Sequence, residues 1–255
     1  MTDQQIARAA LVTGAARRIG RAIALALHEA GYAVAIHTQN SVAEAETLRD
    51  EIVRRGGRAA VVRADLSDHA AVAGLVAVAA AAVGPLTLLV NSAATFERDE
   101  IGALEPERFD RQFAINLKAP LFLAEAFAAQ ADANAGASIV NILDQRVFKL
   151  TPQFVSYTLS KSALHAATRM LAQALAPNVR VNAVAPGPTM QSARQEPDDF
   201  ARQSAAVPLG HGPTAREIAE AVIYLAGARS VTGVTLAVDG GQHVAWRTAD
   251  SDVNE

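Results

Sequence analysis

Residues 10–20 read Ala-Leu-Val-Thr-Gly-Ala-Ala-Arg-Arg-Ile-Gly, and this stretch decides the fold. A short apolar strand predicted over residues 10–13 runs through a turn at Gly14 into a helix predicted over residues 18–30. A glycine at the strand end allows a tight turn, and small residues after it let a phosphate approach the backbone. The N–H groups at the start of the helix point toward such a ligand. The stretch favours a dinucleotide site, and an ordinary strand-to-helix turn is the alternative interpretation.

The rest of the chain continues this alternation of strand and helix. Further strands are predicted at residues 32–37, 59–63, 86–91, 138–143, 179–184 and 234–238, and further helices at residues 41–55, 68–83, 106–132, 156–176 and 217–227. The strands are continuous apolar runs, so both faces of the sheet are predicted to be buried. Such a pattern forms either an open parallel sheet or a (β/α)₈ barrel. Seven strands and the first turn favour the open form, a Rossmann-like doubly wound α/β sheet with helices on both faces.

We expect a single domain over residues 1–255, because no linker divides the chain. Residues 186–213 carry five prolines and are predicted to form a mobile flap. Residues 248–255 are predicted to form a flexible polar tail.

The composition excludes several classes of protein. The chain has 255 residues, 51% hydrophobic and 19% charged, which suffices for a large core. A net charge of −3 provides no positive field for nucleic acid. The absence of cysteine excludes disulfides and thiolate metal sites, and the six histidines lack metal-binding spacing. No apolar run reaches the roughly 20 residues that span a bilayer. We therefore expect a cytoplasmic protein that binds a small molecule and no metal.

The end of the second predicted strand indicates which dinucleotide binds. Residues 37–41 read His-Thr-Gln-Asn-Ser and contain no acid. Dinucleotide folds that prefer NAD usually place an acid there to bind the ribose 2′-hydroxyl. Arg17 and Arg18 lie in the facing turn, and arginine binds the 2′-phosphate that an acid would repel. The sequence therefore predicts NADP(H) as the cofactor.

The segment Tyr157-Thr158-Leu159-Ser160-Lys161 places a tyrosine and a lysine on one helix face. With this motif in view, residues 8–241 resemble the short-chain dehydrogenase/reductase family. The first turn resembles that family's Thr-Gly-x-x-x-Gly-x-Gly, with Arg18 in place of the middle glycine. Further segments resemble the family's other motifs: Asp65-Leu66, Asn91-Ser92-Ala93-Ala94, Asn116 in a helix, and Pro186-Gly187-Pro188-Thr189.

The resemblance implies roles for these residues. Tyr157 donates a proton, and the charge of Lys161 lowers the pKa of the tyrosine. Lys161 also binds the nicotinamide ribose, and Asn116 supports a water that relays protons. The implied cofactor contacts are Gly14, Arg17, Arg18, Ile19, His37, Asn40, Ser41, Asp65, Leu66, Asn91, Ala93, Tyr157, Lys161, Pro186, Gly187 and Thr189.

One departure from the family narrows the expected substrate. Asp144 stands 13 residues before Tyr157, where most members carry a serine. An aspartate there, an arginine in the first turn and Phe96 after the fourth strand resemble the pteridine reductases and bacterial dihydromonapterin reductases. His37 and Ser41 also match them, whereas Asn40 replaces an arginine. The implied substrate contacts are Arg18, Phe96, Asp144 and Tyr157.

The chemistry of Asp144 agrees with this resemblance. A carboxylate repels the alkoxide that forms when a ketone is reduced, whereas the C=N of a pterin needs a proton on nitrogen, which an acid supplies. Asp144 has two other interpretations, as a loop cap or as a serine replacement that abolishes activity, and Phe96 is alternatively ordinary core.

Three functions therefore stand open. The first is an NADPH-dependent reductase of a pterin, with Asn116, Asp144, Tyr157 and Lys161 as catalytic residues. The second is a reductase of another carbonyl or imine, and the third is a catalytically silent NADP-binding sensor. The family commonly forms tetramers through the two long alanine-rich helices that begin near residues 106 and 156, so the resemblance implies a homotetramer.

Overall fold

The computed structural model describes residues 8–132, 135–191 and 195–246. Its centre is one seven-stranded parallel sheet in the order β3-β2-β1-β4-β5-β6-β7, which confirms the predicted open α/β sheet. The strands are β1 (Ala9–Val12), β2 (Ala33–Thr38), β3 (Ala59–Arg63), β4 (Leu88–Asn91), β5 (Ala137–Ile142), β6 (Val179–Pro186) and β7 (Thr235–Val238).

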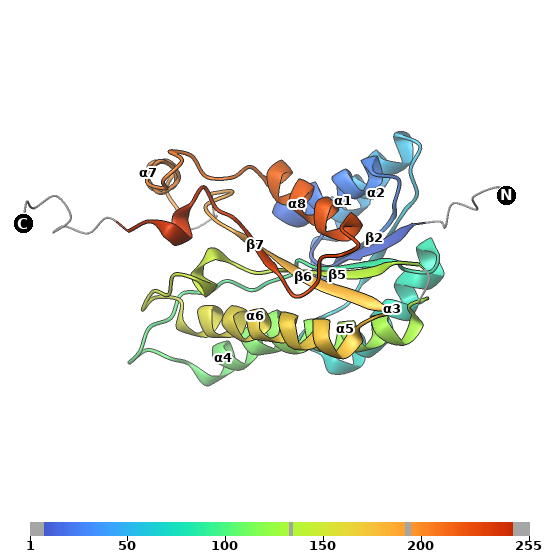
Figure 1. Cartoon of the computed structure of the whole chain (residues 1–255), viewed down its shortest axis with the longest axis horizontal. Coiled ribbons are helices and arrows are strands. Elements are labelled where there is room, and N and C mark those ends of the chain that lie inside the picture. Colours follow the sequence, from blue (N-terminus) through green and yellow to red (C-terminus); the bar gives the residue numbers. More distant parts are fainter. Residues whose placement is uncertain (1–7, 133–134, 192–194, 247–255) are drawn as a thin grey trace, which may run out of the picture.

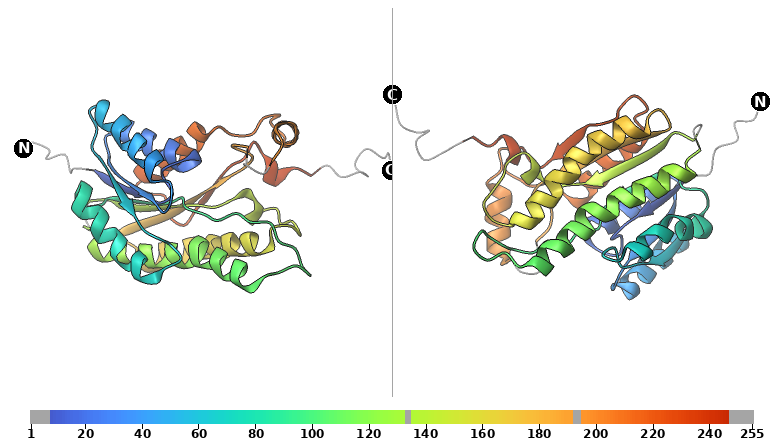
Figure 2. Two further views of the ribbon diagram at one scale, coloured as in Figure 1. Left: turned by 180° about the vertical axis from the view of Figure 1, so that it is seen from behind. Right: turned by 90° about the horizontal axis from the view of Figure 1, so that it is seen from below.

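Helices cover both faces of the sheet, as Figures 1 and 2 show. One face carries α1 (Arg18–Glu29), α2 (Val42–Arg54) and α8 (Ala215–Gly227). The other carries α3 (His69–Val83), α4 (Pro106–Phe113), α5 (Ala119–Gln130) and α6 (Val155–Leu175). The fully buried strands β1, β2, β4 and β5 lie between these two layers, which explains why their sequences are mostly apolar.

Two segments differ from the predicted elements. The helix expected over residues 106–132 is three pieces, because a π-helical turn over Ala114–Lys118 separates α4 from α5. The segment expected as a flap contains the helix α7 (Pro197–Ala205), which has no buried residue. The predicted polar tail, residues 248–255, lies outside the described residues.

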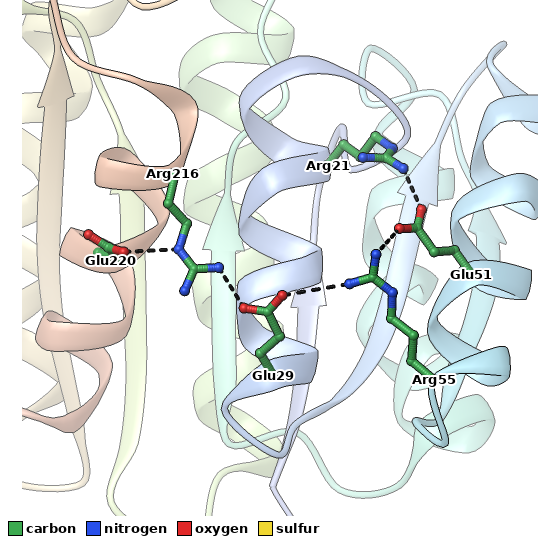
Figure 3. Close-up of polar contacts among 6 residues, drawn as sticks. All are labelled: Arg21, Glu29, Glu51, Arg55, Arg216 and Glu220. Atoms are coloured by element: carbon green, nitrogen blue, oxygen red, sulfur yellow. Dashed lines mark hydrogen bonds and ion pairs between the residues drawn. The ribbon is translucent and has the colours of Figure 1, made fainter.

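A chain of ion pairs fastens α1, α2 and α8 to one another (Figure 3). Glu51 of α2 pairs with Arg21 of α1 and, at 2.5 Å, with Arg55. Glu29 of α1 pairs with Arg55 at 3.7 Å and with Arg216 of α8 at 2.5 Å. These contacts join the three helices on the side facing away from the sheet. They add to the buried apolar contacts that pack this layer.

The strand order reverses direction between β1 and β4, since β2 and β3 extend to one side of β1 and β5–β7 to the other side of β4. In open parallel sheets, the crevice at this reversal, beyond the carboxyl ends of the strands, binds ligands. The residues that the sequence analysis singles out follow these strand ends. In the described part of the chain, no helix is both long and apolar enough to cross a membrane.

Candidate active site

The ends of β1 and β4 are locked together by the first turn. The hydroxyl of Thr13 accepts hydrogen bonds from the N–H groups of Ser92 and Ala93, both at 3.0 Å. Gly14 follows with a φ of +64°, and a Cβ there would lie 2.8 Å from the Cα of Ala93. A Cβ at Gly20 would lie 2.3 Å from the carbonyl oxygen of Gly14. Both positions therefore require glycine, as the pattern of small residues predicts.

The start of α1 faces the reversal point with its N–H groups uncapped. Its N-cap residue, Arg17, makes no side-chain capping bond, and the first turn contains no acid. Uncapped N–H groups and the positive end of the helix dipole suit a pyrophosphate. The exposed side chain of Arg17 lies 3.8 Å from Glu44 at the start of α2, beside the end of β2. It is therefore near the site where a 2′-phosphate is predicted.

Arg18 adopts a role that the sequence does not indicate. Its φ is +54°, and its guanidinium donates to the carbonyl oxygens of Gln191 at 2.7 Å and Met190 at 3.0 Å. The arginine therefore connects the first turn to the segment after β6. The sequence predicts contacts of Arg18 with the cofactor and the substrate, and the structure shows two of its N–H groups bound to this segment.

His37 lies beneath the first turn rather than on an open surface. Its ring is 2% exposed; Nδ1 accepts from the N–H of Gly14 at 3.1 Å, and Nε2 lies 3.2 Å from the carbonyl oxygen of Ala64. These partners place the single ring proton on Nε2. Burial lowers the pKa of His37 to about 4. The neutral imidazole thus links the first turn to the end of β3, and both of its nitrogens already contact protein groups.

The remaining predicted cofactor residues lie along the same edge. The side chain of Asp65 accepts from the N–H and hydroxyl of Ser67, at 2.8 and 2.7 Å, and these bonds lower its pKa. Asn91, at the end of β4, donates to Asn141 at 2.9 Å. A Cβ at Gly187 would lie 2.7 Å from the Cα of Asp239, and Thr189 donates to the carbonyl of Gly187. Other candidates there include Ile19, Asn40, Ser41, Leu66, Ala93 and Pro186.

Asp144, Tyr157 and Lys161 meet where β5 ends and α6 begins. The hydroxyl of Tyr157 donates to Oδ2 of Asp144 at 3.1 Å. The other carboxylate oxygen, Oδ1, accepts from the N–H of Arg146 at 2.8 Å. Lys161 is 2% exposed and donates from Nζ to the carbonyl of Ile142 at 2.7 Å. Tyr157 and Lys161, four residues apart on α6, thus both lie near the end of β5, where Asp144 follows the strand.

The electrostatics of this group correct one expectation. Burial raises the pKa of Tyr157, and the carboxylate of Asp144 raises it further. The sequence predicts instead that Lys161 lowers this pKa, but burial and Asp144 dominate, and Nζ donates to a carbonyl and lies 6.0 Å from the ring centroid. Burial also raises the pKa of Asp144 and lowers that of Lys161 to about 8. Tyr157 therefore keeps its proton at neutral pH.

Asn116 lies in the π-helical turn, and its carboxamide makes three hydrogen bonds within the protein. Its oxygen accepts from the N–H of Thr95 at 2.9 Å, and its nitrogen donates to the carbonyl of Thr95 at 3.0 Å and to the hydroxyl of Ser160 at 3.1 Å. The side chain thereby joins the segment after β4 to α6. Its expected support of a water relay stays a prediction.

Aromatic rings form the wall beside Tyr157. Phe96 is 39% exposed and stacks on Phe154 with centroids 4.4 Å apart and planes 4° apart. It also meets the ring of Tyr157 edge-on at 4.6 Å. The guanidinium carbon of Arg146 lies 5.6 and 5.0 Å from the centroids of Phe96 and Phe154. Phe96 is therefore a partly exposed surface beside the proton donor rather than core.

Sequence reasoning misses Asp99 and Phe154 in this wall. Asp99 is 4% exposed and accepts hydrogen bonds from Ser156, 57 residues later in the chain. Phe154 precedes α6 with a φ of +57°. Neither residue belongs to a motif with fixed spacing, so no local pattern indicates them. The contact between the segment after β4 and the start of α6 emerges only in three dimensions.

Comparisons with known proteins agree with this geometry. The protein-family model described as "Enoyl-(Acyl carrier protein) reductase" matches residues 14–243. Pteridine reductase 1 of Leishmania tarentolae is 34% identical over 288 residues, which cover 94% of this chain and 98% of that protein. A short-chain type dehydrogenase/reductase of Picea abies is 36% identical over 190 residues, covering 71% and 70%.

Among solved structures, FolM Alternative dihydrofolate reductase 1 from Brucella canis, complexed with NADP, superposes with a TM-score of 0.93. It is 50% identical in sequence, and the match covers 96% of this chain and 97% of that chain. The parallel sheet, the first turn, the Tyr157–Lys161 pair and these matches lead to one assignment. The chain belongs to the short-chain dehydrogenase/reductase family of oxidoreductases.

Proposed function

We propose that the protein is an NADPH-dependent reductase of a pterin, such as a dihydropterin or dihydromonapterin. The observation that carries the proposal is the hydrogen bond of 3.1 Å from the hydroxyl of Tyr157 to the carboxylate of Asp144. An acid in contact with the proton donor suits protonation of a ring nitrogen and opposes formation of an alkoxide. The names of the Leishmania and Brucella relatives, a pteridine reductase and a dihydrofolate reductase, support the same substrate class.

NADPH fits the residues at the strand ends. The uncapped start of α1 offers N–H donors to the pyrophosphate, and Arg17 lies near the place of a 2′-phosphate with no acid at the end of β2. The structure of the Brucella canis relative was determined with NADP. When bound, NADPH supplies the hydride that the reduction requires.

The chain's own residues supply the proton and the orientation. Reduction of a C=N bond adds a hydride to carbon and a proton to nitrogen, and we assign the donation of that proton to the hydroxyl of Tyr157. Burial raises the pKa of Asp144, so its protonated form, which would reverse the hydrogen bond from Tyr157, is easier to reach than for an exposed carboxyl. In that form Asp144 can return a proton to the tyrosinate. Lys161, protonated at pH 7 with a pKa of about 8, balances the negative charge that remains on the pair.

Phe96 supplies a flat, partly exposed ring beside Tyr157, with centroids 4.6 Å apart. A planar heterocycle stacked on this ring lies next to the proton donor, and an aromatic contact of this kind contributes about 0.5–1.5 kcal/mol beyond the area it buries. We therefore assign Phe96 to substrate binding, together with Asp144 and Tyr157. Arg18 also borders the site through its bonds to the segment after β6.

NADPH oxidation, measured against a panel of pterins, quinones and aliphatic ketones, tests the proposal. Replacing Asp144→Ala should lower pterin turnover by about 10²–10⁴, the range for a lost general acid. Asp144→Ser restores the common family residue and should lose pterin activity while gaining ketone activity. Phe96→Ala should raise the KM for pterin and leave NADPH binding unchanged.

Each alternative function has its own outcome in this panel. Turnover of ketones or other imines without any pterin turnover would assign the protein to another carbonyl or imine substrate. NADPH binding with no turnover of any substrate would favour the silent sensor. Full pterin turnover by Asp144→Ser would show that Asp144 is not the acid.

A further inference from the structure

The start of α6, the helix that carries Tyr157 and Lys161, is held from outside the helix. Its N-cap residue, Phe154, provides no side-chain acceptor for the first N–H groups. Those groups have no partner within a helix and need an external acceptor. Phe154 also has a φ of +57°, a left-handed conformation that is costly for an aromatic residue and persists only when its surroundings impose it.

Asp99 supplies the missing acceptors. Its carbonyl oxygen accepts from the N–H of Phe154 at 2.9 Å and from that of Val155 at 3.4 Å. Its carboxylate oxygens accept from the N–H of Ser156 at 3.1 and 3.3 Å and also bind the Ser156 hydroxyl. Asp99 is 4% exposed, so these bonds form away from water, where an acceptor at a helix start is most effective.

The same segment carries the proposed stacking ring. Phe96 lies three residues before Asp99 and contacts both Phe154 and Tyr157, with ring centroids 4.4 and 4.6 Å apart. The segment after β4 therefore meets the first turn of α6 twice, once through hydrogen bonds and once through aromatic rings. Moving one contact must displace the other, because only two residues separate Phe96 from Asp99.

We propose that Asp99 is a positioning residue that sets the place of the Tyr157 hydroxyl relative to Phe96. Asp99 touches no reacting group; it acts by joining the substrate-side segment to the start of the catalytic helix. This inference rests on the proposed role of Tyr157 as proton donor. A displacement of about 1 Å at a reacting group lowers turnover by about 100-fold, so the loss of this link should be visible in kcat.

The variants Asp99→Ala and Asp99→Asn test the inference, with Glu100→Gln as the matched control. Glu100 is the adjacent acid, is exposed and pairs with Arg98 rather than with α6. We expect Asp99→Ala to lower kcat for a dihydropterin by about 10–100-fold and to raise KM. The Kd for NADPH, measured by its fluorescence, should rise by a smaller factor than kcat falls, because the first turn is untouched although Tyr157 and Lys161 are also proposed to contact the cofactor. Asp99→Asn keeps one acceptor oxygen and should restore part of kcat.

Amide hydrogen exchange gives a readout that needs no substrate. In Asp99→Ala, peptides covering residues 95–99 and 154–161 should lose protection together, while peptides from α1 and α8 keep theirs. A purely structural role would instead lower the stability of the whole protein without a specific fall in kcat among folded molecules. If Asp99→Ala does not fold, Ser156→Ala removes only the hydroxyl donor and should give a smaller change in the same two peptides.

Two results separate this inference from the proposed function. Wild-type kcat and unchanged exchange at residues 154–161 in Asp99→Ala would overturn the role of Asp99. Undiminished turnover by Tyr157→Phe would overturn the proton-donor assignment, and hydrogen exchange would then still decide whether Asp99 holds the helix.

Discussion

Acid should destabilise this protein through the buried imidazole of His37. Both ring nitrogens are occupied, because Nδ1 accepts from Gly14 and Nε2 faces the carbonyl of Ala64. A second proton has to enter at Nδ1, where it would face the N–H of Gly14 and a dry environment. The folded protein therefore holds the neutral ring, whose pKa falls from its usual 6.5 to about 4 mainly because of burial.

The sign and size of the effect follow from linkage. Between pH 6.5 and pH 4 the unfolded chain binds a proton at this site that the folded protein does not, so the free energy of unfolding decreases as pH falls. A lowering from 6.5 to about 4 corresponds to about 3 kcal/mol in full, at about 1.4 kcal/mol per pH unit. At pH 5 about 2 kcal/mol of this is already lost. That is a large part of a typical total stability of about 5–15 kcal/mol.

Urea unfolding followed by circular dichroism measures this effect at several pH values and one fixed protein concentration. His37→Asn keeps a side-chain acceptor near Gly14 and cannot be protonated, so its stability should decrease less steeply between pH 6.5 and pH 5. His211→Asn is the matched control, because His211 is exposed. Since His37 supports the first turn, NADPH affinity should also fall in acid in the wild type and less so in His37→Asn.

Equal slopes of unfolding free energy against pH in wild type and His37→Asn would refute this reasoning. They would mean that the ring is solvated or already protonated in the folded protein. A reduced slope in His211→Asn would show that exposed histidines account for the acid sensitivity instead.

Three further expectations concern cofactor choice, assembly and the ion pairs. NADPH should bind better than NADH in fluorescence titrations. Arg17→Ala should lower the ratio of the two affinities by about 10–100-fold, whereas Glu44→Gln should raise it. Equal affinities for the two cofactors in the wild type would contradict the assignment. Light scattering should give the mass of a symmetric tetramer, and Leu159→Glu on the exposed face of α6 should dissociate it; a monomer at micromolar concentration would argue against this interface. Glu51→Gln breaks the ion pair with Arg21 that joins α2 to α1 and the pair with Arg55 at the end of α2, and it should lower the unfolding free energy by about 1 kcal/mol, less at high salt; an equal effect from Glu220→Gln, at the end of the network, would not fit.

The elements that sequence analysis predicts well are those that repeat a strong local pattern. Apolar strands flanked by glycine predict all seven strands, and the spacing of Tyr157 and Lys161 places both on one helix near the end of β5. Local sequence patterns suffice for these elements, because a strand buried on both faces requires a run of apolar residues and a helix face requires a spacing of three or four residues.

The elements that sequence analysis misses depend on contacts between distant segments. The exposed helix α7 buries no residue, so it lacks an apolar stripe, and the prolines around it favour the prediction of a flap. The hydrogen bonds of His37 and Asp99 are made by single polar residues whose partners lie 23 to 57 positions away in the sequence. The rise in the pKa of Tyr157 likewise comes from burial and from the carboxylate of Asp144, and the spacing of Tyr157 and Lys161 indicates neither.

The three hydrogen bonds of the Asn116 carboxamide restrict how the sequence can change. Its three bonds need one acceptor and two donated hydrogens in a fixed arrangement around Thr95 and Ser160. Aspartate, although equal in shape, would set an oxygen against the carbonyl of Thr95, and leucine would leave that peptide unit without partners. In a library that substitutes every position in turn, residue 116 should therefore accept almost no replacement, while the partly exposed Phe122 two turns later accepts many. Residue 116 should therefore stay constant while neighbouring positions vary. Substitutions that change the substrate are expected among the residues of the wall beside Tyr157.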